Sequence, residues 1–147
     1  MITRSYFIIL TLMLLASCTP DSSRAGQGGT LTGTCWELTH INGTPLPPQE
    51  IGGAITLEFD NDGDLFGHTA NNHYFSTYDT TGARLDAAHL GHTDVGETPE
   101  GIQYFDLFSN VYSYSATNNQ LTLYDSTDAA IFEYIAADPK VCKYLSP

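Results

Sequence analysis

The stretch ITLEFDNDGDLF, residues 55–66, decides the fold class of the chain. Apolar and polar side chains alternate over residues 55–59, which is the period of a strand with one buried face. Residues 61–63 are Asn-Asp-Gly, the residue types of a tight turn, and apolar residues resume shortly after them. The stretch therefore predicts an antiparallel β-hairpin.

Short strands separated by turn residues continue on both sides of this hairpin. The alternation is also clear at residues 121–123 and 131–134, and residues 117–119 supply a further turn. We expect strands at residues 34–41, 54–60, 64–69, 84–89, 111–116, 120–125 and 130–135. The chain is therefore predicted to be mainly β, in the α+β class, with an antiparallel curved sheet or an open small β-barrel.

One segment has the period of a helix instead. Thr98 is a hydroxyl cap residue, and a proline follows it at the first helical position. Apolar residues then recur at every third position, at Ile102, Phe105 and Phe108. We expect one amphipathic helix over about residues 99–109, packed on the sheet, with its aromatic side chains in the core rather than on a ligand-binding surface.

Residues 1–17 have the pattern of a signal peptide that ends in a lipid-attachment site. Arg4 supplies a basic start, residues 6–15 form a short apolar core, and small residues precede Cys18. The apolar run is about half the roughly 20 residues that a transmembrane helix needs. We therefore expect cleavage before Cys18 and lipid attachment to it, the alternative being an ordinary secretory signal that is cut elsewhere.

This N-terminal pattern resembles the bacterial lipoprotein signal, which implies a diacylglycerol on Cys18 and usually an added N-acyl chain such as palmitate. Two or three acyl chains are enough for stable anchoring. Thr19 stands where many Gram-negative bacteria use Asp to retain lipoproteins in the inner membrane, which favours the outer membrane, on the periplasmic side. Residues 18–32 are predicted to be a lipidated flexible tether and residues 33–147 to form one domain.

The charge of the chain restricts its partners. Five basic residues stand against 17 acidic ones, for a formal net charge of −12. Such a surface repels nucleic acid and anionic lipid, so we expect no nucleic-acid partner and membrane contact only through the anchor at Cys18. The acidity has two explanations, general solubility or a dedicated cationic partner.

The two cysteines other than Cys18 stand near the two ends of the predicted domain. In an oxidising envelope Cys35 and Cys142 are expected to form a disulfide. Closing a loop of about 100 residues contributes ~4.7 kcal/mol to stability in the chain-entropy model. Two buried free thiols are the alternative, because the sequence does not show that the two Cα atoms lie close enough.

A series of short motifs runs through the predicted domain. They are GTCWEL at 33–38, ING at 41–43 followed by Pro45 and Leu46, LEFD at 57–60, then Gly67, Asn72, Tyr78, Thr93, Val111 and Tyr114, and LTLYD at 121–125. In this order they resemble the META domain, the HslJ-like family of bacterial envelope proteins, through about Tyr134. The resemblance implies envelope or stress association, and it implies no agreed activity.

The chain departs from the family in two segments and at one further position. Where the family usually has Gly-Cys-Asn, residues 70–72 are Ala-Asn-Asn, and where it often has Thr-Arg-Met-Ala-Cys, residues 93–97 are TDVGE. Asn71 and Glu97 thus replace both family cysteines. Their joint loss suggests that these cysteines pair in the family and that the Cys35 pair is a substitute. Ser76 also replaces the second family glycine, so we expect that turn to differ.

Two groups of residues could hold a metal ion. Asp60, Asp62 and Asp64 alternate as in a calcium loop, but the glycine comes two positions too early and position twelve is Asn71, so a hairpin turn is the better interpretation. The histidines could bind zinc or copper only if the strands bring them together. They form two pairs, His68 with His73 and His89 with His92.

We predict no enzymatic activity, catalytic residue, cofactor or metal site. The sequence has no Gly-x-Ser-x-Gly elbow and no Gly-rich phosphate loop, and neither Cys35 nor Cys142 has a catalytic signature. The favoured function is a nonenzymatic lipid-anchored envelope protein, a binding, structural or stress-associated module with a possible envelope protein as partner.

Two alternatives belong to other functional classes. One is a carrier that holds a small apolar ligand in a cavity between helix and sheet, and the other is an inhibitor of a basic lysozyme. The carrier is distinguished by whether the central aromatic side chains fill the interior or line a void. These side chains are Tyr74, Phe75, Phe105 and Phe108.

Overall fold

The computed structural model describes residues 30–47 and 53–142. The predicted signal peptide, Cys18 and most of the predicted tether lie outside these residues, as does the last part of the predicted domain. No helix in the described part is long and apolar enough to cross a membrane.

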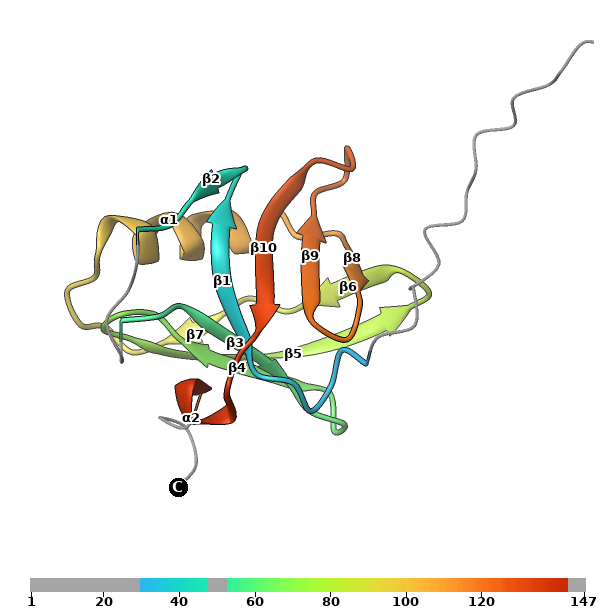
Figure 1. Cartoon of the computed structure of the whole chain (residues 1–147), viewed down its shortest axis with the longest axis horizontal. Helices are drawn as coiled ribbons and strands as arrows, with labels where there is room; N and C mark the ends of the chain where they lie inside the picture. Colours follow the sequence, from blue (N-terminus) through green and yellow to red (C-terminus); the bar gives the residue numbers. More distant parts are fainter. Residues whose placement is uncertain (1–29, 48–52, 143–147) are drawn as a thin grey trace, which may run out of the picture.

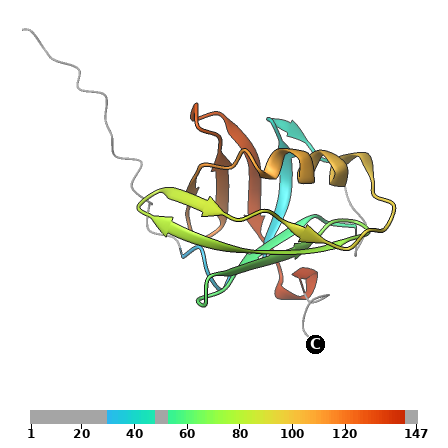
Figure 2. The same cartoon turned by 180° about the vertical axis from the view of Figure 1, so that it is seen from behind.

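The described residues form ten strands and two helices (Figure 1). The strands are β1 (Trp36–Ile41), β2 (Thr44–Pro45), β3 (Thr56–Phe59), β4 (Asp64–His68), β5 (His73–Thr81), β6 (Arg84–Ala87), β7 (Gly91–His92), β8 (Ser113–Ala116), β9 (Gln120–Tyr124) and β10 (Ala130–Ala136). The helices are α1 (Pro99–Phe108) and α2 (Pro139–Cys142), and in both views α1 lies above and α2 below the strands β3, β4 and β5 (Figures 1 and 2).

Eight of the strands form a closed antiparallel barrel. Their order is β1-β3-β4-β5-β6-β8-β9-β10, and β10 pairs back with β1, with Leu38 opposite Tyr134. β2 adds to the edge of β1, and β7 pairs with β5 beyond the end of β6. The prediction of a mainly β, antiparallel small barrel is confirmed, but the barrel is closed and not open, because β1 pairs with residues 132–136 of β10.

The predicted helix is present, and a second short helix follows the barrel. α1 begins at the cap residue Thr98, whose hydroxyl accepts a hydrogen bond from the backbone N–H of Gly101 at 3.2 Å. Tyr104 and Phe108 are buried against the barrel, whereas Ile102 is exposed. The apolar face of α1 is therefore only partly in the core. α2 was not predicted.

Large aromatic side chains fill the barrel interior. The fully buried ones are Trp36, Phe59, Tyr74, Tyr104, Phe132 and Tyr134. Gly67 on β4 makes room for one of them, because a Cβ atom at this position would overlap the hydroxyl of Tyr74 and the carbonyl oxygen of Thr56. A glycine of the family motif is thus explained by packing.

The two ends of the domain are joined. Cys35 and Cys142 form the predicted disulfide, with their Cα atoms 5.8 Å apart and a sequence separation of 107 residues. At the N-terminal end, Leu31 is buried and its carbonyl oxygen accepts a hydrogen bond of 3.1 Å from the indole N–H of Trp36. The packed part of the chain therefore includes Leu31, which lies within the predicted tether.

Candidate functional site

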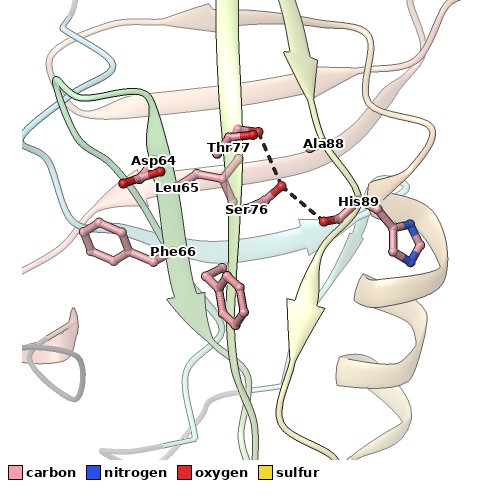
Figure 3. Close-up of a pocket in the computed structure, with 8 residues that line it drawn as sticks. Asp64, Leu65, Phe66, Ser76, Thr77, Ala88 and His89 are labelled. Carbon is pink, nitrogen blue, oxygen red and sulfur yellow. Dashed lines mark hydrogen bonds between the residues drawn. The ribbon is translucent and has the colours of Figure 1, made fainter.

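A hollow of about 430 Å³ lies on the outside of the barrel between β4, β5 and the segment after β6 (Figure 3). Phe66 and Phe75 are directly opposite each other across β4 and β5, and Phe66 is half-buried. Phe75 is 67 % exposed. Its ring packs over Gly91 of β7, where a Cβ atom would lie 2.9 Å from the ring. We call this aromatic-lined depression the outer hollow.

β6 and β7 both pair with the same edge of β5, and residues 88–90 form the irregular segment between them. Ser76 on β5 spans this break, since its hydroxyl lies 3.3 Å from the carbonyl oxygens of both Thr77 and His89 (Figure 3). The N–H of Ala88 also donates to the carbonyl of Thr77, at 2.9 Å. Ser76 therefore lies within a strand, not in the turn that was expected, and its hydroxyl supports the irregular segment.

A groove runs along the exposed side of α1. It consists of two hollows of about 210 and 350 Å³ that share Phe105 and Asp106 as lining residues. The imidazole of His92 stacks on the ring of Phe105, with centroids 4.5 Å apart and planes at 19°. Val95 and Ile102, which are 58 % and 52 % exposed, line the larger hollow. We call the two hollows together the α1 groove.

A network of hydrogen bonds fixes the wall of the α1 groove. The side-chain oxygen of Asn72 accepts from the N–H of Val95 at 2.8 Å and from the hydroxyl of Thr93 at 2.9 Å. The side-chain amide of Asn72 donates to the carbonyl of Val95 at 2.9 Å and to the carboxylate of Glu97 at 2.7 Å. Asn72 is buried, so these four hydrogen bonds hold residues 93–97 in place.

Glu97 is the carboxylate of this region whose pKa is shifted. Its partial burial alone would raise its pKa, but hydrogen bonds from the side chains of Thr69 and Asn72 and from Thr98 outweigh that effect and lower the pKa. A Cβ atom on Gly101 would overlap the Glu97 side chain, so the carboxylate lies against the first turn of α1. Glu97 is therefore a structural anion that joins the loop to the helix.

The sequence model of the META domain matches residues 29–137, which is most of the chain. The chain belongs to the META domain family. None of the curated proteins matches it.

Solved structures share the fold of this META domain. A DUF4847 family protein from Bacteroides vulgatus superposes with a TM-score of 0.57 at 16 % identity, over 74 % of this chain and 96 % of that one. A protein solved by NMR gives a TM-score of 0.59 at 20 % identity, over 74 % and 93 % of the two chains. Another NMR structure, from Burkholderia xenovorans, gives 0.52 at 20 % identity over 81 % and 97 %.

The two positions where this META domain lacks the family cysteines lie side by side. The side-chain amide of Asn71 donates a hydrogen bond of 2.6 Å to the carbonyl of Gly96, the residue before Glu97. The proximity supports the interpretation that cysteines at these positions would pair. Here hydrogen bonds from Asn71 and Asn72 join the two segments instead.

Two of the groups that were considered as metal ligands make hydrogen bonds to the backbone instead. The carboxylate of Asp60 accepts from the N–H groups of Asp62 and Asp64, both at 2.9 Å, which is the predicted hairpin turn. His68 is buried, and its Nε2 atom lies 2.9 Å from the carbonyl oxygen of Val141 in α2.

The other three candidate histidines, His73, His89 and His92, are exposed, and none of them belongs to a group of metal ligands within the described residues. His73 lies 6.4 Å from His68, centroid to centroid, while His92 and His89 line the hollows. Over residues 30–47 and 53–142, no group of three or more His, Cys, Asp or Glu could hold a metal ion.

Negative charge surrounds the hollows of the META domain. The residues that line the outer hollow and the α1 groove include four carboxylates and no lysine or arginine; the carboxylates are Asp64, Asp94, Glu97 and Asp106. Arg84 is elsewhere, paired with Asp86 at 2.5 Å and stacked on Tyr112. The sequence did not reveal this site. The helical period placed Phe105 in the core, and Phe75 was expected to fill the interior or to line an internal void, whereas it is exposed.

Proposed function

We propose that this META domain protein is a nonenzymatic, lipid-anchored protein of the bacterial envelope that binds another envelope protein. The binding face comprises β5, residues 88–97 and α1. One observation carries the proposal: buried aromatic side chains fill the barrel, while the hollows and three exposed apolar side chains lie outside it. The exposed side chains are Phe75, Val95 and Ile102.

The positions of four aromatic side chains favour a surface site over a carrier cavity. Tyr74 is buried within the barrel, and Phe108 is buried against it, where it also lines the smaller hollow of the α1 groove. Phe105 is half-buried and Phe75 is exposed, and each lines a hollow that opens to the outside. A side chain available on the surface can contact a protein partner directly, so we do not propose the carrier function.

The anchor is the second part of the proposal. Cleavage before Cys18 and acylation of its thiol and new amino group would hold the domain at the outer membrane, facing the periplasm. The support is the order of a basic start, a short apolar core and small residues before Cys18. Palmitate labelling should mark the wild type and leave Cys18→Ser unlabelled, and an unlabelled wild type would contradict the anchor.

Photo-crosslinking in living cells tests partner binding. A photoreactive phenylalanine analogue replaces Phe75 or Ile102 in the full chain. Ile135 and Tyr112, which are exposed and lie outside the elements of the binding face, serve as control positions. We expect protein adducts at Phe75 and Ile102 and none at the controls. The absence of an adduct at all four positions would contradict a protein partner.

A further inference from the structure

The α1 groove combines an apolar floor with a negatively charged rim. Phe105 separates its two hollows, and the stacked ring of His92 supports Phe105. The larger hollow is flanked by the exposed side chains of Val95 and Ile102. Each hollow has the volume to take at least one apolar side chain of a partner.

The charges of the rim are free to pair with a partner. Asp94 and Asp106 line the groove, both are exposed, and neither side chain has a hydrogen bond or an ion pair within residues 30–47 and 53–142. Glu97 differs, because its carboxylate is engaged by Thr69, Asn72 and Thr98. Two free carboxylates beside exposed apolar side chains would complement a partner segment in which basic side chains flank an apolar one.

The groove is also held in its shape before a partner binds. Four hydrogen bonds of Asn72 fix the wall at residues 93–97, and the cap at Thr98 fixes the start of α1. Binding would therefore order few additional backbone groups. A preformed site favours a short segment docking into it over a partner that must remodel the domain.

We propose that the α1 groove binds a cationic segment of the partner protein, with an apolar side chain beside Phe105 and flanking basic side chains on Asp94 and Asp106. This inference rests on the proposed function and adds the position of the site and the chemistry of the partner. The net charge of −12 adds long-range attraction for the same segment and speeds its association at low salt.

A defined peptide tests the chemistry of the groove. The protein is the whole mature chain with Cys18→Ser, secreted to the periplasm so that it stays soluble and oxidised. The probe is a seven-residue peptide in which lysine and leucine alternate, titrated by NMR and calorimetry. Two control peptides replace all lysines with glutamate or all leucines with serine. We expect shifts at Ile102, Phe105 and Asp106 with the first peptide alone.

Matched variants test the position of the site. Ile102→Ser should weaken binding of the probe about tenfold, whereas Ile135→Ser, an exposed isoleucine on β10, should leave binding unchanged within about twofold. Asp106→Asn should weaken binding about threefold at low salt and less at high salt, whereas Asp62→Asn, in the β3–β4 turn, should have a smaller effect.

Three results would overturn the inference. They are an absence of binding at millimolar probe, equal binding of the glutamate peptide, or equal weakening by the matched control variants. The cellular crosslinks separate this failure from failure of the proposed function. Adducts at Phe75 without any at Ile102 would refute the α1 groove and keep a protein partner, whereas no adduct at any position would refute the partner itself.

Discussion

The hydroxyl of Tyr104 on α1 lies 2.8 Å from the hydroxyl of Tyr74 on β5, inside the barrel. Tyr74 donates its one proton to the carbonyl of Thr56, so Tyr104 must donate to Tyr74. The hydroxyl of Tyr134 on β10 lies 3.1 Å from that of Tyr104 and must donate to it. A directed chain of three buried hydroxyls therefore ties α1 to both sides of the barrel.

Because these hydrogen bonds run in one direction, Tyr104, the central tyrosine, should contribute most to stability. Tyr104→Phe leaves the buried proton of Tyr134 without its acceptor, and we expect the free energy of unfolding to fall by about 2 kcal/mol. Tyr134→Phe removes only the last donor, so it should lower the free energy of unfolding by about 1 kcal/mol. Urea unfolding of the two variants measures the difference. Equal effects, or a larger effect of Tyr134→Phe, would contradict the assigned direction.

Burial raises the pKa of Tyr74, Tyr104 and Tyr134 well above the ordinary value of 10.0. A raised folded-state pKa means that their stabilising contribution is complete below pH 10 and is lost as the pH rises above it. Ultraviolet absorbance during an alkaline titration should show these three tyrosines ionising only as circular dichroism reports unfolding. Ionisation of every tyrosine in the native state near pH 10 would contradict their burial.

Glu97 should make the stability of the domain sensitive to acid. Its pKa is lowered in the folded state, so its contribution is complete above about 4.5, the ordinary value, and is lost as the pH falls through the lowered pKa. At pH 7, Glu97→Gln should lower the free energy of unfolding by about 1 kcal/mol, and the difference should shrink in acid. Glu37→Gln on β1 is the control. A difference that does not change with pH would argue against this role.

The disulfide should provide a large part of the stability. Replacing both Cys35 and Cys142 with alanine should lower the free energy of unfolding by about 4 kcal/mol, because the bridge closes a loop of 107 residues. Urea unfolding of the variant and of the reduced wild type should agree. A loss below about 1 kcal/mol would show that the bridge does not restrict the unfolded chain.

Much of the fold could be predicted because its signals are local. Seven strands and α1 follow from alternation, turn residues and a helix cap. β5 is the longest strand and was missed, because Phe75 faces outward while Ser76 faces the interior, which reverses the usual apolar pattern. Closure of the barrel depends on pairing β1 with β10, and no local pattern encodes contacts between the two ends of a domain.

The candidate site was harder to predict than the fold. The helical spacing of Ile102, Phe105 and Phe108 places them on one apolar face of α1. The spacing does not show how much of that face the barrel covers. Only the position of α1 reveals that Phe108 is buried while Ile102 is exposed. The resemblance to the family did suggest that residues 71 and 97 lie close together, and the hydrogen bond from Asn71 to Gly96 is consistent with this.

Native mass spectrometry of the whole mature chain, secreted with Cys18→Ser and purified from periplasm without reduction, tests the central claim that binding occurs outside a filled barrel. We predict the mass of the oxidised polypeptide with no small molecule attached, alone or in complex with a copurifying protein. A lipid or other small apolar molecule retained in the folded chain would contradict the claim and restore the carrier function.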